Sequence, residues 1–139
     1  MYPVIKDVMK KYEGRVRLVV RYLPFHNNSV LAAAVTEAAG EQGKYWEMQE
    51  LLFTRQPEWG EKSTPQTNLF LQYANELGLD MGQFQADLNK PEYQEKIARD
   101  TADAAALGLK GTPSIFVNGQ QVRQLGAEAL TVAIEAALP

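Results

Sequence analysis

The stretch LGLKGTPSIFVNG, residues 107–119, determines the fold more than any other part of this chain. Gly108 stands where the preceding helix would take a left-handed C-cap. Residues 114–117 form a short apolar run rich in β-formers, and Asn118-Gly119 favours a two-residue hairpin turn whose central positions need positive φ. The predicted order is a helix, a tight loop at Gly111-Thr112-Pro113, a strand, a hairpin turn and a second strand.

Pro113 stands at the entrance of the predicted strand, where no ladder donor is needed. A cis bond between Thr112 and Pro113 would be an uncommon feature, and it would leave the backbone before Pro113 free to pair with an extended peptide. A trans bond would make the same tripeptide a simple turn that ends a helix. The ordered elements on both sides favour the first interpretation.

Composition limits the classes of function. The 139 residues are enough for one domain with a real core, and 45% hydrophobic with 22% charged residues is ordinary for a globular protein. The net charge of −3 argues against a nucleic-acid surface, and no apolar run approaches a membrane span of about 20 residues. The N-terminal residues carry lysines at 6, 10 and 11 but no apolar signal core.

The chain contains no cysteine and one histidine, His26. Without cysteine these residues form no disulfide, no catalytic thiolate and no cysteine metal site. A single histidine disfavours a histidine metal site and a serine–histidine triad. We therefore expect no metal and no cofactor.

Hydrophobic spacing gives the order of the elements. A helix over residues 2–12 precedes a strand over residues 15–25, whose apolar residues on both faces are typical of an inner strand. Further helices are predicted over the following residues, with Gly40 and Gly43 as interruptions and 56–66 as a polar loop: 30–39, 45–53, 69–77, a short helix capped by Asp80, 93–107 opened by Pro91, and 130–138.

This order is helix–strand, then a block of helices, then strand–strand–helix. It predicts an α/β fold in which residues 1–28 and 104–139 form the scaffold and residues 29–103 are a helical insertion.

Several side chains outside the proline loop have a structural and a functional interpretation. Helical spacing favours core packing over a substrate groove for Trp46, Met48, Leu52 and Phe53. Trp59 is expected to fold back over the insertion, and His26 to belong to a turn rich in capping residues rather than to donate protons. The carboxylates that we expect on solvated helix faces are Glu37, Glu41, Glu47, Glu50, Asp100 and Asp103.

Four motifs in the right order resemble the DsbA family of thiol–disulfide oxidoreductases. They are RVRLVVRYLPF followed by His26, GKYWEMQELLF at 43–53, LGLDMGQF at 77–84, and LGLKGTPSIFVNG at 107–119. The resemblance covers nearly the whole chain and implies a thioredoxin-like fold with a helical insertion. It also implies disulfide exchange with cysteine-containing proteins or extended peptides, in a periplasmic or other extracytoplasmic location.

In that family an apolar strand ends in Cys-x-x-Cys, which opens the first helix. Residues 1–4 resemble the continuation of this helix, so the resemblance places the dithiol and its strand before Met1. The first cysteine of the pair exchanges with substrate through a mixed disulfide. Only supporting roles carry over to this chain: Thr112 and Pro113 match the loop that faces the dithiol and positions substrate, and Gly111 allows close approach. The chain itself is expected to be redox-inactive.

The missing strand would lie between residues 16–23 and 114–118. Its absence would expose two strand edges, which are pairing hazards. We therefore expect that these two strands pair directly or that another chain fills the gap, as in a homodimer or a strand-swapped assembly.

Two other functions remain open. One is a non-catalytic module that binds an extended peptide along the Thr112–Pro113 loop. The other is a cysteine-independent enzyme that resembles kappa-class glutathione transferases, which carry a serine at the dithiol position. These enzymes are usually longer and have a larger insertion.

Overall fold

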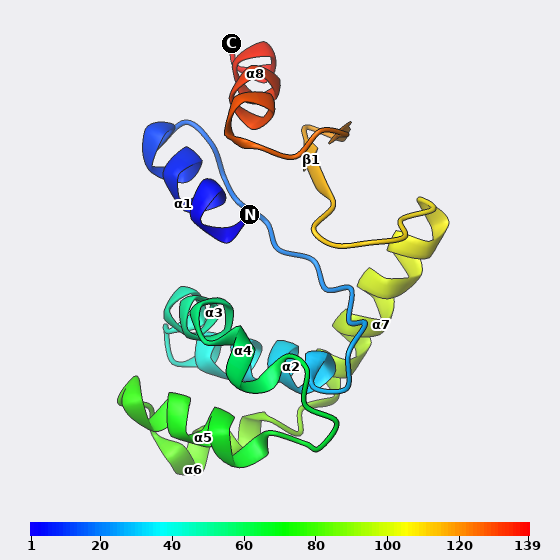
Figure 1. Ribbon diagram of the computed structural model, residues 1–139. Helices are drawn as coiled ribbons and strands as arrows, with labels where there is room; N and C mark the ends of the chain where they lie inside the picture. Colours follow the sequence, from blue (N-terminus) through cyan, green and yellow to red (C-terminus); the bar gives the residue numbers. More distant parts are fainter. The chain divides into compact units, whose positions relative to one another are not determined.

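The computed structural model describes residues 1–139, which form two compact units (Figure 1). The scaffold unit comprises Met1–Val20 and Leu107–Pro139, and the helical unit comprises Arg21–Ala106. These boundaries differ from the predicted division after residues 28 and 103. The chain enters the helical unit earlier because Arg21 and Tyr22 are already hydrogen-bonded to Asp100 within it.

The scaffold unit consists of two helices and one hairpin. Its elements are α1 (Tyr2–Lys11), β1 (Ile115–Val117), β2 (Gln120–Val122) and α8 (Ala127–Ala137). Helix α8 packs against α1 and against both strands. Four buried residues form the core, with apolar residues of the hairpin packed against them: Val8, Tyr12, Leu130 and Ile134.

The hairpin confirms the prediction made from Asn118-Gly119. Both residues have positive φ, 46° and 82°, and the antiparallel register pairs Ile115 with Val122 and Val117 with Gln120. Because side chains alternate along a strand, Ile115 and Val117 pack against the core while Phe116 stays 37% exposed.

The prediction of a strand over residues 15–25 is wrong, because the structure has no strand in this segment. The sheet contains only β1 and β2, so the expected direct pairing of residues 16–23 with 114–118 is wrong as well. Residues Val16, Leu18 and Val20 are half-buried, but Val19 is 64% exposed, so the segment is not buried on both faces. A strand needs a hydrogen-bonded neighbour, and apolar alternation cannot supply one.

The helical unit is built around α2 (Ser29–Glu41), which contacts α3, α5, α6 and α7. Small side chains let α2 be buried along most of its length. The other helices are α3 (Tyr45–Thr54), α4 (Gln56–Trp59), α5 (Thr67–Glu76), α6 (Met81–Asp87) and α7 (Pro91–Ala106). The core's largest fully buried side chains come from three of them and include Met48, Phe70, Tyr73 and Phe84.

One helix boundary in this unit follows directly from a local capping signal. Asp80 caps α6 as predicted, because its Oδ1 accepts a hydrogen bond of 2.9 Å from the Gln83 backbone N–H. Gly40, in contrast, lies inside α2 and does not interrupt it. A Cβ at Gly40 would lie 3.3 Å from a ring carbon of Tyr45, so the glycine allows α3 to approach.

The prediction for the aromatic side chains of α3 and α4 holds for Trp59 and fails for Trp46 and Phe53. Trp59 does fold back: it is buried on the short helix α4, and its Nε1 donates a 3.0 Å hydrogen bond to the Leu52 carbonyl. Trp46 and Phe53 were expected in the core, but they are 51% and 48% exposed. Met48 and Leu52, four residues apart, define the buried face of α3, and Trp46 and Phe53 point away from it.

Two carboxylates expected on solvated faces make buried or partly buried contacts instead. Asp100 is 6% exposed and accepts hydrogen bonds from Arg21 Nε at 2.8 Å and from the Tyr22 backbone N–H at 3.0 Å. Glu37 accepts from the Tyr22 hydroxyl at 2.7 Å and from Lys96 Nζ at 2.6 Å. These partners lie far away in sequence, so helical spacing alone could not reveal them.

None of the helices is both long and apolar enough to cross a membrane.

Candidate functional site

The predicted site is the loop between α7 and β1. Helix α7 ends at Ala106, and Gly108 has φ of 70°, the left-handed conformation predicted for this position. Further along, the Ser114 hydroxyl donates a 2.8 Å hydrogen bond to the Gly111 carbonyl. This bond closes the turn that contains Thr112 and Pro113.

The three residues predicted to face a substrate are all exposed: Gly111, Thr112 and Pro113. The peptide bond between Thr112 and Pro113 is cis. Apart from Gly111 and its two chain neighbours, no heavy atom lies within 4 Å of the point where a Cβ would stand on Gly111. The surface at Gly111 is therefore open to a partner.

The core of the scaffold unit holds this loop in place. Ile115, two residues after Pro113, packs against the core formed by α1 and α8. The two helices are joined by the Tyr12 hydroxyl, which donates a 2.7 Å hydrogen bond to Glu135, and by Lys11, whose Nζ lies 3.6 Å from the same carboxylate. The hydrogen bond from Tyr12, and then the charge of Lys11, lower the pKa of Glu135.

The loop offers groups for binding and none for nucleophilic attack by sulfur. Thr112 brings one hydroxyl, which can donate and accept, and Pro113 brings an apolar ring without an N–H.

His26 belongs to the helical unit, where its backbone N–H donates a 3.2 Å hydrogen bond to the Ser29 hydroxyl and its carbonyl accepts from the Ser29 N–H at 3.0 Å. The predicted turn around His26 is therefore present.

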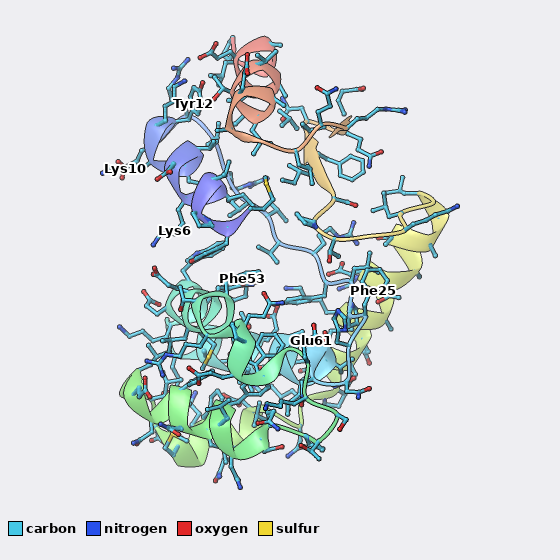
Figure 2. The ribbon with its side chains drawn as sticks, in the orientation of Figure 1. Lys6, Lys10, Tyr12, Phe25, Phe53 and Glu61 are labelled. Carbon is cyan, nitrogen blue, oxygen red and sulfur yellow. The ribbon has the colours of Figure 1, made fainter.

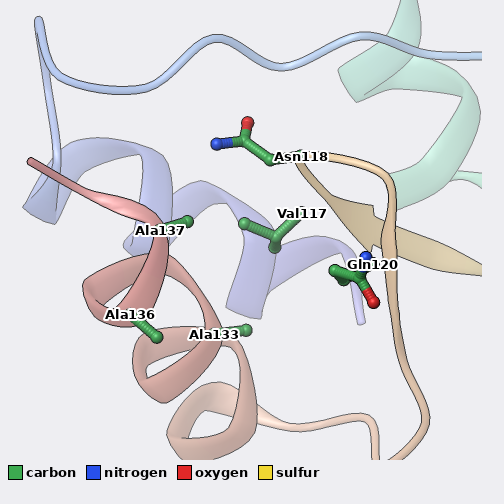
Figure 3. Close-up of a pocket in the computed structure, with 6 residues that line it drawn as sticks. All are labelled: Val117, Asn118, Gln120, Ala133, Ala136 and Ala137. Atoms are coloured by element: carbon green, nitrogen blue, oxygen red, sulfur yellow. The ribbon is translucent and has the colours of Figure 1, made fainter.

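The scaffold unit has a hollow of about 380 Å³ at the far end of the hairpin (Figure 3). Val117, Asn118 and Gln120 form one side, and alanines of α8 form the other. The alanines leave this space because their side chains are short. The hollow lies at the Asn118-Gly119 turn, whereas Pro113 precedes the opposite end of β1.

The sequence analysis missed a second hollow, in the helical unit. It measures about 190 Å³ and lies between residues 25–27 and residues 60–63. Phe25, 53% exposed, lines it together with Glu61, and Figure 2 labels both side chains. The two walls are separated by more than thirty residues, so no local motif marks this hollow.

A family model described as Thioredoxin matches residues 1–136. The chain belongs to the thioredoxin family. A solved structure of a thioredoxin-like oxidoreductase from Silicibacter pomeroyi superposes with a TM-score of 0.78 and 31% sequence identity, covering 97% of this chain and 77% of that one. The predicted thioredoxin-like α/β fold with a helical insertion and the resemblance to DsbA-like oxidoreductases are confirmed.

Curated relatives of this thioredoxin-family chain carry another name. It is 37% identical over 131 residues to a Na⁺/H⁺ antiporter NhaA from Herminiimonas arsenicoxydans and 34% identical over 139 residues to Na⁺/H⁺ antiporter NhaA 3 from Salinispora tropica. These matches cover 94% and 97% of the chain but 20% of each relative. The chain therefore spans about a fifth of the length of these relatives.

Proposed function

We propose that this chain is the substrate-binding part of a DsbA-like thiol–disulfide oxidoreductase. The exposed Gly111-Thr112-Pro113 loop carries the proposal, because a thioredoxin-family chain presents it at the entrance of β1 with open space at Gly111. An extended polypeptide would pair with the loop backbone and contact the Thr112 hydroxyl and the Pro113 ring. The substrates would be cysteine-containing proteins outside the cytoplasm.

Disulfide exchange needs a thiolate, and these 139 residues contain no cysteine. We therefore place the thiol outside them, on residues that precede Met1 in the whole protein. In the exchange, the thiolate attacks one sulfur of a substrate disulfide; a mixed disulfide forms, and the other substrate sulfur leaves as a thiolate. The present loop would hold the substrate backbone during that step.

The unpaired edge of β1 supports a further part of the proposal. Strand β1 has one neighbour, β2, and the apolar side chains of Val19 and Phe116 are partly exposed. We propose that an additional strand, from a second copy or from outside these residues, pairs with this edge. A sharp monomer peak in light scattering coupled to size-exclusion chromatography, with no peptide co-purifying, would contradict an added strand in the isolated chain.

The substrate-binding role is tested by a binding measurement on the 139-residue chain. A reduced, unfolded polypeptide should bind to the wild type, and Pro113→Ala should weaken this binding because the loop gains an N–H and loses its fixed φ. Pro65→Ala, in an exposed loop of the helical unit, is the matched control. Equal affinity of all three proteins, or no binding at all, would overturn the proposed role of the loop.

A second candidate is a non-catalytic module that binds polypeptide. It is favoured by the absence of cysteine from the chain and by its match to a fifth of proteins named as antiporters. The coding sequence before Met1 separates the two candidates. An in-frame Cys-x-x-Cys there supports the oxidoreductase, and its absence, with polypeptide binding retained, supports the module.

A further inference from the structure

The hollow between residues 25–27 and 60–63 is part of neither the proline loop nor the core. Its volume of about 190 Å³ is below the roughly 300–1,000 Å³ of sites that enclose a whole small molecule. A space of this size fits one side chain. All of its lining residues belong to the helical unit.

One buried amide holds both walls of the hollow. Asn28 is 1% exposed and directly follows the wall formed by residues 25–27. Its Nδ2 donates to the carbonyls of Lys62 at 3.0 Å and Thr64 at 3.1 Å, and its Oδ1 accepts from the Gln66 N–H at 2.9 Å. The hollow is therefore fixed before any ligand arrives, which lowers the entropic cost of binding.

The lining combines an aromatic ring with a carboxylate. Phe25 keeps 53% of its surface exposed, although it is large and apolar. The face of an aromatic ring attracts cations, and the Glu61 carboxylate in the same hollow does so too. The helical unit as a whole adds to this attraction, since it holds seven Lys or Arg and thirteen Asp or Glu residues.

From these observations we propose that the hollow is a subsite for one basic side chain, lysine or arginine, of an extended polypeptide. The Phe25 ring contacts the cationic group and Glu61 pairs with it. The choice of a polypeptide as the ligand rests on the proposed function; the preference for a cation rests on the lining of the hollow.

Lys62 also lines the hollow and opposes this preference. Its carbonyl is fixed by Asn28, but its ammonium group is on an exposed, flexible four-carbon chain that can turn toward water. Replacing Lys62 with glutamine should therefore strengthen the binding of a basic peptide.

The test is a nuclear magnetic resonance titration of the isotope-labelled 139-residue chain with three blocked glycine–serine peptides. The peptides differ only in a central lysine, glutamine or glutamate. The lysine peptide should shift the amide signals of residues 25–27 and 60–63 and bind about twofold to fivefold more tightly than the glutamine peptide. The glutamate peptide should bind most weakly.

Variants assign this preference to the hollow. Phe25→Leu and Glu61→Gln should each remove about half or more of the lysine preference, because each deletes one attraction for the cation. Glu95→Gln, which neutralises an exposed carboxylate on α7, removes the same charge elsewhere in the helical unit and should lower the lysine preference much less than Glu61→Gln does. If Phe25→Leu, Glu61→Gln and Glu95→Gln all reduced the preference for the lysine peptide equally, the preference would not come from the hollow. This result would overturn the subsite.

The other possible results of the titration also decide whether the subsite exists. Tighter binding of the glutamate peptide, equal affinity for the three peptides, or no shift at the hollow overturns the subsite. Lysine preference at the hollow in a protein that proves to have no disulfide exchange leaves the subsite standing and rejects the proposed function. Disulfide exchange in a protein that shows no lysine preference at the hollow supports the proposed function and rejects the subsite.

Discussion

The hydroxyl of Tyr12 lies 2.7 Å from Oε1 of Glu135 and donates a hydrogen bond to it. This bond joins the end of α1 to α8, although the two residues are 123 positions apart in sequence. Strand β1 packs against the same two helices through Ile115, just after the proline loop. The position of that loop therefore depends on contacts between the first and last helices.

We expect Tyr12→Phe to destabilise the scaffold unit by about 1 kcal/mol, the ordinary net contribution of one hydrogen bond. The ring of Tyr12 is buried, and a phenylalanine ring would keep its packing. The fall in the free energy of unfolding therefore measures the contribution of the hydroxyl alone. Urea unfolding, followed by circular dichroism, gives the free energy of unfolding. An unchanged free energy of unfolding in the variant would show that this bond does not hold α1 to α8.

The same contact predicts loss of stability in acid. The pKa of Glu135 is lowered in the folded protein, chiefly by the Tyr12 hydrogen bond, from an ordinary value of 4.5. Its stabilising contribution is therefore complete above that ordinary value and disappears as the pH falls through the lower folded pKa. Between pH 7 and pH 3, Glu135→Gln should lose less stability than the wild type in urea unfolding. Equal losses would contradict the assignment.

Asp100→Ala should destabilise the helical unit by about 2–3 kcal/mol. The substitution leaves the Tyr22 backbone N–H and Arg21 without their buried acceptor. The loss stays below that of a fully buried ion pair because the Arg21 side chain is 52% exposed. Asp103→Ala removes an exposed carboxylate that also pairs with Arg21 and should cost less than about 1 kcal/mol. Thermal unfolding that ranks the two variants equally would reject the buried role of Asp100.

Asn28→Ala should cost about 2 kcal/mol, because the loop after α4 loses the amide that binds its carbonyls and the Gln66 N–H. Asn27→Ala, at an exposed neighbouring position, should change stability by less than about 0.5 kcal/mol. Hydrogen exchange should show faster exchange at Gln66 in the Asn28 variant alone. Unchanged protection of Gln66 would show that Asn28 does not hold the loop.

Local chemistry explains what the sequence could predict. The positive φ of Asn118 and Gly119, the cap at Asp80 and the left-handed Gly108 each depend on a few adjacent residues, and all three are as expected. The exposed Gly111-Thr112-Pro113 loop follows from the same signals. Recognition of the family needed the order of four motifs, which a single motif could not provide.

The errors concern features that depend on distant residues. Residues 15–25 have the apolar pattern of an inner strand, but a strand also requires a neighbour, and the structure gives this segment none. Asp100 has the position of a surface charge on α7, but Arg21 and Tyr22 cover it. The hollow lined by Phe25 and Glu61 could not be predicted, because Asn28 brings its two walls together only in the folded chain.

The most direct test of the central claim measures dithiothreitol-dependent reduction of insulin by the whole gene product beside the 139-residue chain. We expect the whole protein to catalyse the reaction, Pro113→Ala to slow it, and the 139-residue chain to show no catalysis because it holds no thiol. Catalysis by the 139-residue chain, or a whole protein with no activity and no cysteine, would contradict the assignment as a disulfide oxidoreductase.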